Sequence, residues 1–245
     1  MRIFSNNNTV RRFMRLHLII PVLNEADNLR ELLPQLLSEL SPADQITVAD
    51  GGSTDATPEV LDPYPAVNHL GCRDCGRARQ MNEAANLRPG DFEVLYFLHA
   101  DTRPPGGFRK DIRESIEAGY EVGCYRFKFD MWHPLLSINA FFTRFRGLAC
   151  RGGDQSLYLT RKAFDQLGGF RDMIIMEDYD IIQRTWASDF RFRIIPRSIM
   201  VSARKYRVNG WLRVQLANLR VFRMYKAGAP QEEMVRTYRE MLEPW

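Results

Sequence analysis

Acidic and imidazole side chains directly follow one of the most apolar runs of the sequence. Asp101 comes after the run 92–98, with Thr102 beside it. A carboxylate there is well placed to hold Mg²⁺ or Mn²⁺ against a diphosphate, because both ions accept oxygen ligands. His99 stands where a second oxygen ligand is expected, and a nitrogen ligand suits Mn²⁺ better than Mg²⁺. The alternative is that Asp101 only caps a helix beginning near 104–105.

An acidic pair, Glu177 and Asp178, begins a stretch with helical spacing. Acidic side chains in a first helical turn often interact only with the helix dipole. At the edge of a cleft, however, Asp178 can act as a general base that takes a proton from a hydroxyl nucleophile. The sequence leaves both interpretations open.

Two further stretches suit a nucleotide. Asp50 and Gly51 follow a short apolar run. The Asp50 carboxylate could accept a hydrogen bond from a nucleobase imide or a ribose hydroxyl. The alternative is that both residues only form a turn. Arg77 and Arg79 stand at a predicted helix start, where guanidinium and free N–H groups favour a phosphate. A solvated basic face is the alternative for the two arginines.

Polar loops supply the remaining candidates. Asn24 and Glu25 follow the first apolar run and either cap a helix or contribute to a site. Asp154 and Gln155, after two glycines, offer a carboxylate and an amide to a polyol or another polar acceptor, although an ordinary turn explains them equally well.

Two cysteines, Cys72 and Cys75, have the spacing of a redox or zinc pair. A closed zinc site needs four ligands, yet the sequence has no second pair of this spacing and only His69 nearby. We therefore favour two incidental thiols in a loop.

The elements that must position these residues alternate between strand and helix over the first hundred residues. Short apolar runs predict buried strands at 16–23, 46–49 and 92–98. Helical spacing predicts helices between them: one capped by Asn24 or Asp27 and carrying leucines from 29 to 40, a short one after 55, and one at 76–87.

This order predicts an α/β fold with a parallel sheet and right-handed crossovers. Ligands of such sheets bind beyond the carboxyl ends of the strands. The polar clusters at 21–25, 50–55 and 99–101 lie at such ends, so we expect them to converge.

The second half of the chain is less regular. We expect strands at 121–130 and 155–159, and helices at 134–149, 161–167, 177–188, 211–226 and 231–242. The helix at 211–226 interleaves arginines with leucine and phenylalanine. It either lies on an anionic bilayer, near a lipid-linked acceptor, or packs on the core with its basic face in water.

Composition narrows the class of protein. The chain has 245 residues, of which 45% are hydrophobic and 26% charged, so disordered, collagen-like and coiled-coil classes are excluded. A net charge of +4 suits anionic small molecules or a lipid surface rather than nucleic acid.

No run approaches the roughly 18 apolar residues of a membrane helix. We interpret residues 1–14, with Arg11-Arg12, as a polar lead-in rather than a secretory signal, and expect a cytoplasmic protein.

Four motifs, in this order, resemble glycosyltransferase family 2: Ile-Ile-Pro-Val-Leu-Asn-Glu (19–25), Asp-Gly-Gly-Ser-Thr-Asp (50–55), Phe-Leu-His-Ala-Asp-Thr (97–102) and Met-Glu-Asp-Tyr-Asp (176–180). The resemblance spans about residues 16 to 190. The motifs at 76–82 and 152–155 and the basic tail are similar to one bacterial subgroup, the radical-SAM/selenodomain-associated transferase 2 set.

The resemblance implies a GT-A fold, a Rossmann-like three-layer α/β/α architecture with a mainly parallel sheet. We expect this domain over residues 15–205, and amphipathic basic helices over 206–245 that pack on the same domain or extend it. The resemblance also implies a nucleotide-diphosphate sugar donor, Mn²⁺ or Mg²⁺, and inversion at the anomeric carbon. The donor site it implies comprises Pro21, Leu23, Glu25, Asp50, Gly51, Arg77, Arg79, His99, Ala100 and Asp101.

The same resemblance makes Asp178 the catalytic base, with Glu177 beside it, and Asp101 the metal ligand of a DxD-type motif. It places Asp154 and Gln155 at the acceptor. The sequence departs from the family at His99, which replaces the first Asp of that motif and is the second metal-ligand candidate. The Gln-x-x-Arg-Trp motif of processive members is also missing, so we expect a non-processive, hexosyltransferase-like enzyme.

Two other classes stay open. A nucleotidyltransferase can use a similar sheet and metal, but such enzymes usually carry a glycine-rich basic loop after the first strand, where this chain has 21–25. A nucleotide-sugar-binding protein without turnover is kept open by His99, since a fold alone does not establish activity.

Overall fold

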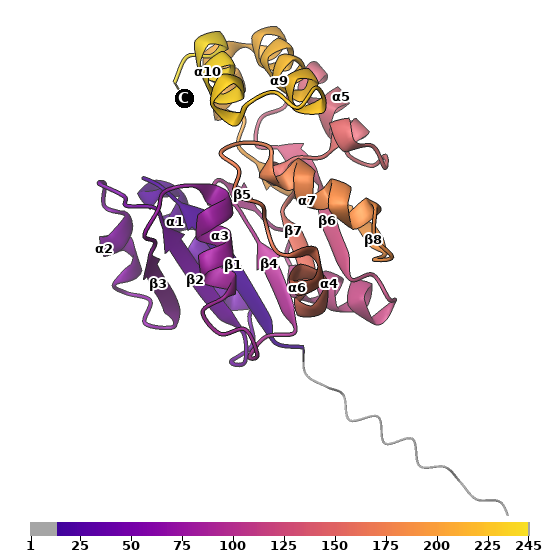
Figure 1. Cartoon of the computed structure of the whole chain (residues 1–245). Coiled ribbons are helices and arrows are strands. Elements are labelled where there is room, and N and C mark those ends of the chain that lie inside the picture. The colour runs from indigo at the N-terminus through magenta and orange to yellow at the C-terminus, as the bar shows by residue number, and fades with distance from the viewer. Residues whose placement is uncertain (1–13, 245) are drawn as a thin grey trace, which may run out of the picture.

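The computed structural model describes residues 14–244, which contain an eight-stranded sheet with helices on both faces (Figure 1). The polar lead-in predicted from the sequence lies, except for Met14, outside the described residues. The strand order is β3-β2-β1-β4-β7-β6-β8-β5. The strands are β1 (Leu16–Val22), β2 (Gln45–Asp50), β3 (Val67–Gly71), β4 (Val94–Phe97), β5 (Thr102–Arg103), β6 (Val122–Phe129), β7 (Leu157–Thr160) and β8 (Phe192–Val201).

The sheet is mixed, with a parallel half that matches the prediction. β1 pairs in parallel with β2 and β4, and β2 pairs in parallel with β3. β6 and β8 are also parallel, whereas β7 runs antiparallel to both β4 and β6, and β5 runs antiparallel to β8. The carboxyl ends of β1, β2 and β4 therefore meet at one edge of the sheet.

Helices cover both faces of the sheet, because the central strands are apolar on both sides. On β1, Leu18 and Ile20 pack in one core, whereas Ile19 packs in the other. The first core includes side chains of α1 (Ala26–Glu39), α2 (Thr57–Leu61) and α4 (Phe108–Glu117). The second includes side chains of α3 (Arg77–Ala85), α6 (Arg161–Leu167) and α7 (Glu177–Trp186). The predicted three-layer α/β/α class is confirmed.

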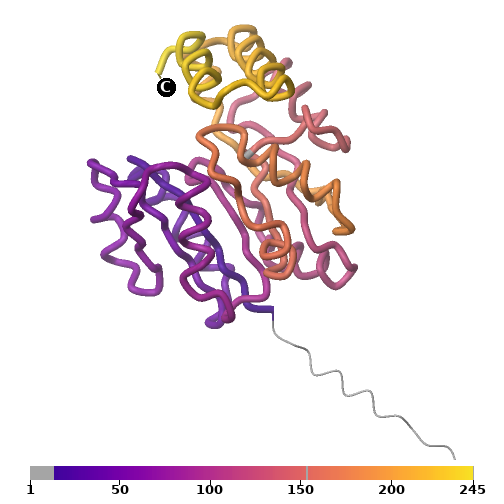
Figure 2. The backbone as a smooth tube through the Cα atoms, viewed as in Figure 1, coloured from indigo at the N-terminus to yellow at the C-terminus, as the bar shows by residue number. Residues whose placement is uncertain are grey.

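The remaining helices gather at one end of the molecule (Figures 1 and 2). They are α5 (Pro134–Phe142), α8 (Arg204–Asn209), α9 (Trp211–Lys226) and α10 (Gln231–Met241), with short 3-10 turns η1 (Leu148–Cys150) and η2 (Gly153–Gln155). Helices α9 and α10 share two small apolar clusters that contain Val214, Ala217 and Met234. None of the helices within residues 14–244 has the length and apolar character needed to cross a bilayer.

Three strands and one helix were not predicted from the sequence, and their composition explains why. β3 is an edge strand with the polar sequence Val-Asn-His-Leu-Gly, so it lacks an apolar run. β8 contains Pro196, which argues against a strand. The pairing of β8 with β6 shifts register around that proline, so a bulge accommodates the residue that cannot donate to the ladder. β5 and α8 are too short to show a period.

The predicted helix at 134–149 is shorter in the structure. Helix α5 ends at Phe142, where the Thr143 hydroxyl donates to the carbonyl of Ala140 (2.7 Å). The buried Arg151 guanidinium then donates to the carbonyls of Thr143 and Phe145. These bonds satisfy carbonyl groups that a longer helix would have used internally, so the chain turns away before η1.

Candidate active site

A cleft of about 830 Å³ opens beyond the carboxyl ends of β1 and β4. Its walls come from the loops after these strands, from the N-terminal ends of α3 and α7, and from α5, α8, α9 and α10. The cleft brings together ten residues predicted from the sequence: Pro21, Leu23, Glu25, Arg77, His99, Ala100, Asp101, Asp154, Glu177 and Asp178.

The other four predicted site residues are not part of this lining. Gly51 adjoins Asp50, whose buried carboxylate accepts hydrogen bonds from the backbone N–H groups of Gly52 (3.0 Å) and Ser53 (2.8 Å). Arg79 forms an ion pair with Asp172 (2.7 Å) on the surface.

Gln155 is buried and bonds within the protein. Its amide nitrogen donates to the carbonyl of Cys150 (2.8 Å), and its amide oxygen lies 3.4 Å from the Cys124 sulfur. Its predicted role at the acceptor, like the roles of the other three residues, stays a prediction.

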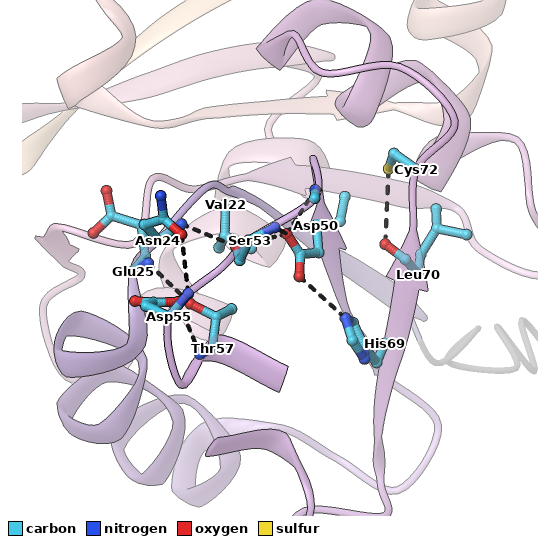
Figure 3. Close-up of polar contacts among 12 residues, drawn as sticks. Val22, Asn24, Glu25, Asp50, Ser53, Asp55, Thr57, His69, Leu70 and Cys72 are labelled. Carbon is cyan, nitrogen blue, oxygen red and sulfur yellow. Dashed lines mark hydrogen bonds and ion pairs between the residues drawn. The ribbon is translucent and has the colours of Figure 1, made fainter. Parts of the chain in front are cut away.

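The loops after β1 and β2 are joined by Asn24 (Figure 3). The residue adopts a left-handed conformation (φ 59°), and its side-chain oxygen accepts hydrogen bonds from the N–H groups of Thr54 (2.7 Å) and Asp55 (3.2 Å). Asp55 in turn accepts hydrogen bonds from the N–H of Ala26, in the first turn of α1, and from the N–H of Thr57. The prediction that Asn24 or Asp27 caps α1 is wrong, because the N-cap residue is Glu25 and no side-chain cap bond forms.

A buried glutamine fixes the same edge from the opposite side. The Gln80 amide nitrogen donates to the carbonyls of Val22 (2.8 Å) and Ala49 (2.7 Å), which belong to β1 and β2. A Cβ atom on Gly51 would lie about 3.1 Å from this amide, so glycine is favoured by the close approach. Sequence reasoning gave Gln80 no role, although it belongs to the motif at 76–82.

Asp101 and His99 fit a divalent cation. Burial, together with the charges of Asp154 and Glu25, raises the pKa of the Asp101 carboxyl to about 6. Burial and the nearby Arg77 lower the pKa of His99 to about 4, so its imidazole is neutral at pH 7, the form that binds metals. A cation here would relieve the repulsion among the carboxylates. Within residues 14–244, no three His, Cys, Asp or Glu side chains form a ready cation cage, so donor oxygens would have to complete the shell.

The acidic pair of α7 lies at the start of that helix, after the left-handed residue Met176 (φ 69°). Glu177 is buried and forms an ion pair with Arg77 (Nε to Oε1, 2.9 Å). Burial and the Glu177 charge raise the pKa of Asp178 to about 8, against the opposing effect of Arg77. The cleft therefore contains a carboxyl group whose pKa is close to neutral pH, as general-base catalysis requires.

Sequence reasoning missed the basic and aromatic wall of the cleft. Arg204 and Lys205 line it, and the charge of Arg204 opposes the rise in the pKa of Asp101. Phe127, Phe129 and Tyr206 also line it, with the rings of Phe129 and Tyr206 5.2 Å apart. A signal was present in the sequence, since residues 190–230 contain ten Lys and Arg and no Asp or Glu.

Cys72 and Cys75 are both free thiols. Burial and the neighbouring Glu83 raise the pKa of Cys72 to about 12, the opposite of a reactive thiol. These observations agree with the interpretation of two incidental thiols.

The sequence and the fold of this chain were compared with known protein families and solved structures. The family model described as glycosyl transferase family 2 matches residues 17–159. No curated protein is similar enough in sequence to count as a relative. Among solved structures, mannosyltransferase PcManGT from Pyrobaculum calidifontis in complex with GDP-Man and Mn²⁺ is 19% identical, with a TM-score of 0.64 over 93% of this chain and 69% of that one.

Two further structures have similar folds. S. aureus TarS 1–349 is 15% identical, with a TM-score of 0.62 over 93% of this chain and 70% of that one. Glucosyl-3-phosphoglycerate synthase from Mycobacterium tuberculosis, in complex with Mn²⁺, UDP and glucosyl-3-phosphoglycerate, is 14% identical, with a TM-score of 0.57 over 89% of this chain and 81% of that one.

The mixed sheet, its two helical layers and the cleft at its carboxyl edge correspond to the GT-A fold of these structures. The family model covers more than half of the sequence, so the chain belongs to glycosyl transferase family 2.

Proposed function

We propose that this chain transfers a sugar from a nucleotide-diphosphate sugar to an acceptor hydroxyl, in a metal-dependent reaction that inverts the anomeric carbon. The observation that carries the proposal is Asp178, a buried carboxyl with a pKa of about 8 that lines the same cleft as Asp101. The structures of similar fold that hold UDP-GlcNAc, or GDP-Man with Mn²⁺, support a donor of this class.

In the proposed reaction, the acceptor oxygen forms a bond to the anomeric carbon while Asp178 takes the hydroxyl proton. The bond from that carbon to the diphosphate oxygen breaks with its electron pair, and the nucleoside diphosphate leaves from the opposite face. Arg77 offers a guanidinium to the charge that develops on the leaving group. Asp101, with His99 as second ligand, would hold Mn²⁺ or Mg²⁺, and the ion would supply further positive charge there.

The remaining residues have positioning roles in this proposal. Pro21, Leu23 and Glu25 line the nucleoside pocket, and Asp50, with Gly51, faces the base. Arg79, which pairs with Asp172 outside the cleft lining, has at most a minor role at the phosphates. Asp154 contacts the acceptor, and Gln155 acts at the acceptor only indirectly, by bonding the carbonyl of Cys150 behind the cleft wall.

Finer features stay part of the proposal. We expect a non-processive hexosyltransferase of the radical-SAM/selenodomain-associated subgroup that works in the cytoplasm at the inner face of the membrane. Its acceptor is expected to be lipid-linked. Residues 211–226 are expected to contact the membrane, since arginines alternate there with exposed leucines.

The test combines donor binding with product analysis. UDP-, GDP-, CDP- and dTDP-sugars are screened by thermal shift, each with EDTA, Mg²⁺ or Mn²⁺, because a bound ligand raises the melting temperature. We expect one nucleotide class to stabilise the protein only with metal. Asp101→Ala should abolish that metal-dependent shift. Asp178→Asn should keep the shift but lower transfer by roughly 10²–10⁴-fold, the usual contribution of a general base.

The alternatives predict different results. A nucleotidyltransferase would release pyrophosphate instead of a nucleoside diphosphate. A binding protein without turnover would show the thermal shift but no product. Near-normal turnover by Asp178→Asn would contradict the assignment of the base.

A further inference from the structure

Helix α5 is almost entirely apolar, yet most of it is exposed. Its sequence is Pro-Leu-Leu-Ser-Ile-Asn-Ala-Phe-Phe, and Leu136 is its only buried residue. Ile138, Phe141 and Phe142 are 46–50% exposed, and Trp132, just before the helix, is 84% exposed. A helix that is hydrophobic on all sides is normally buried, but nothing within residues 14–244 covers these side chains.

Helix α9 adds a second exposed apolar row. Leu212, Leu216 and Leu219 lie on the side of the helix opposite Val214 and Ala217, which are buried. The nine exposed side chains on and beside the two helices are named here the α5–α9 face: Trp132, Leu135, Ile138, Phe141, Phe142, Phe145, Leu212, Leu216 and Leu219.

The two helices meet at Tyr206. Its hydroxyl interacts with Asn139 of α5 and accepts a hydrogen bond from the Gln215 amide of α9 (3.3 Å). Figure 1 shows both helices at the same end of the molecule. The exposed rows therefore belong to one region rather than to two unrelated surfaces.

The two segments that carry the face are basic, although Arg213 also pairs with Glu243 (3.2 Å) near the C-terminal end of the chain. Residues 131–153 contain three arginines and no acidic residue, and residues 190–230 contain ten Lys and Arg and no acidic residue. The arginines 144, 146, 213, 220 and 223 are all exposed. Since the whole chain has a net charge of only +4, the basic residues are concentrated in these segments. Two copies of so basic a face would repel one another, whereas an anionic bilayer would attract it.

The face also continues into the cleft. Asn139, Phe142 and Thr143 of the α5 segment line the cleft together with Gln215 and Asn218 of α9. A surface that covered the α5–α9 face would therefore lie beside the site that contains Asp178.

We propose that the α5–α9 face docks the protein on an anionic bilayer, with α5 as the inserted element. An exposed tryptophan and phenylalanines flanked by arginines are the side chains that favour the interfacial layer of a membrane. This docking deepens the proposed function, and its role in catalysis rests on that function: an acceptor carried in the bilayer would then lie beside the cleft. The docking itself requires no catalysis.

Vesicle flotation tests the inference. The full chain is mixed with vesicles of phosphatidylcholine alone, or with about 30% phosphatidylglycerol added to give a negative surface potential. We expect the protein to float with the anionic vesicles only, and to be released in about 0.5 M NaCl, which screens surface charge.

Matched variants separate apolar and basic contributions. Ile138→Asp on α5 is compared with Leu87→Asp, which is similarly exposed (42%) but lies after the C-terminal end of α3, away from the cleft. Arg220→Glu/Arg223→Glu is compared with Lys110→Glu/Arg113→Glu, a pair of the same spacing on α4. We expect the two face variants to lower the partition coefficient by about tenfold or more and the controls by less than about twofold.

Trp132→Ala, outside any helix, provides a second apolar variant if Ile138→Asp fails to fold, and it should also weaken binding. Absence of flotation by the wild-type chain, or equal losses in face and control variants, would overturn the inference. So would a concentration-dependent dimer that Ile138→Asp dissociates without any vesicle binding, since the occupant would then be a second copy. Asp178→Asn should float like the wild type, which separates docking from catalysis.

Discussion

Asp178 is buried beside Glu177, and this environment raises the pKa of its carboxyl to about 8. In an unfolded chain, an aspartic acid ionises near pH 4. Between about pH 4 and pH 8, the folded protein therefore keeps a proton that the unfolded chain has lost. The free energy of unfolding consequently decreases as pH rises through that window.

Asp178→Asn removes this ionisation and should stabilise the metal-free protein. In EDTA, we expect its melting temperature to match that of the wild type near pH 4 and to exceed it by about 2 °C or more at pH 8, the shift that about 1 kcal/mol gives in a domain of this size. Asp180→Asn is the control and should lower the melting temperature, because the Asp180 carboxylate pairs with Arg171 and Arg184. A difference between Asp178→Asn and wild type that is independent of pH would contradict the cost of ionising Asp178.

Arg77 and Arg79 are two residues apart but differ in their surroundings. Arg77 lines the cleft and pairs with Glu177, whereas Arg79 pairs with Asp172 outside the lining. We expect Arg77→Ala to weaken donor binding by roughly 10- to 100-fold, the effect of losing a charged hydrogen bond. Arg79→Ala should change affinity by less than about twofold. Titration calorimetry with the donor identified by thermal shift measures both, and equal losses would support the phosphate contact predicted for Arg79.

At the scale of elements, Asn24 holds two neighbouring loops together through the N–H groups of Thr54 and Asp55. Loss of these bonds in Asn24→Ala, together with an unfavourable left-handed backbone, should destabilise the protein by about 1–3 kcal/mol. The corresponding decrease in melting temperature is about 2 °C or more.

Two further variants separate the contribution of the backbone conformation from that of the side-chain oxygen. Asn24→Gly keeps the backbone conformation but lacks the side-chain oxygen, whereas Asn24→Asp keeps the oxygen acceptor. We expect Asn24→Asp to be the most stable of the three variants. If Asn24→Ala melts at the wild-type temperature, the two loops are held together by other contacts.

For the molecule as a whole, the C-terminal helices line the cleft and share an apolar cluster with the two residues that precede α7. Met234 of α10 is buried against Val221 and Met224 of α9, next to Ile175 and Met176, which precede the catalytic candidates. Met234→Ala removes a buried side chain and should lower the free energy of unfolding by about 2–5 kcal/mol. We expect a single unfolding transition whose melting temperature is lower by about 4 °C or more.

Met200→Ala on β8 is the control, since Met200 is 37% exposed, and it should melt within about 1 °C of the wild type. Calorimetry is the measurement. A separate early transition in Met234→Ala, with an unchanged main transition, would mean that the C-terminal helices unfold as an independent unit.

Much of the parallel half of the fold was predictable, because its signals are local. Apolar runs such as 16–22 must be buried on both faces, and polar residues end each run. Strand β3 was missed because it is a polar edge strand, and β8 was missed because Pro196 interrupts its pattern. The left-handed conformation of Asn24 also requires a partner loop 30 residues away.

The three-layer class, the position of the polar clusters at the carboxyl edge and the order of the family motifs follow from the amino-acid sequence, because strand and helix periods and loop residues are properties of neighbouring positions in the chain. Which charges meet depends on how the distant elements pack together. The Arg77–Glu177 pair joins residues a hundred positions apart, and the pKa of Asp178 depends on burial by several elements at once. The exposure of α5 could likewise not be predicted from the sequence, because an apolar segment does not show whether the rest of the fold covers it.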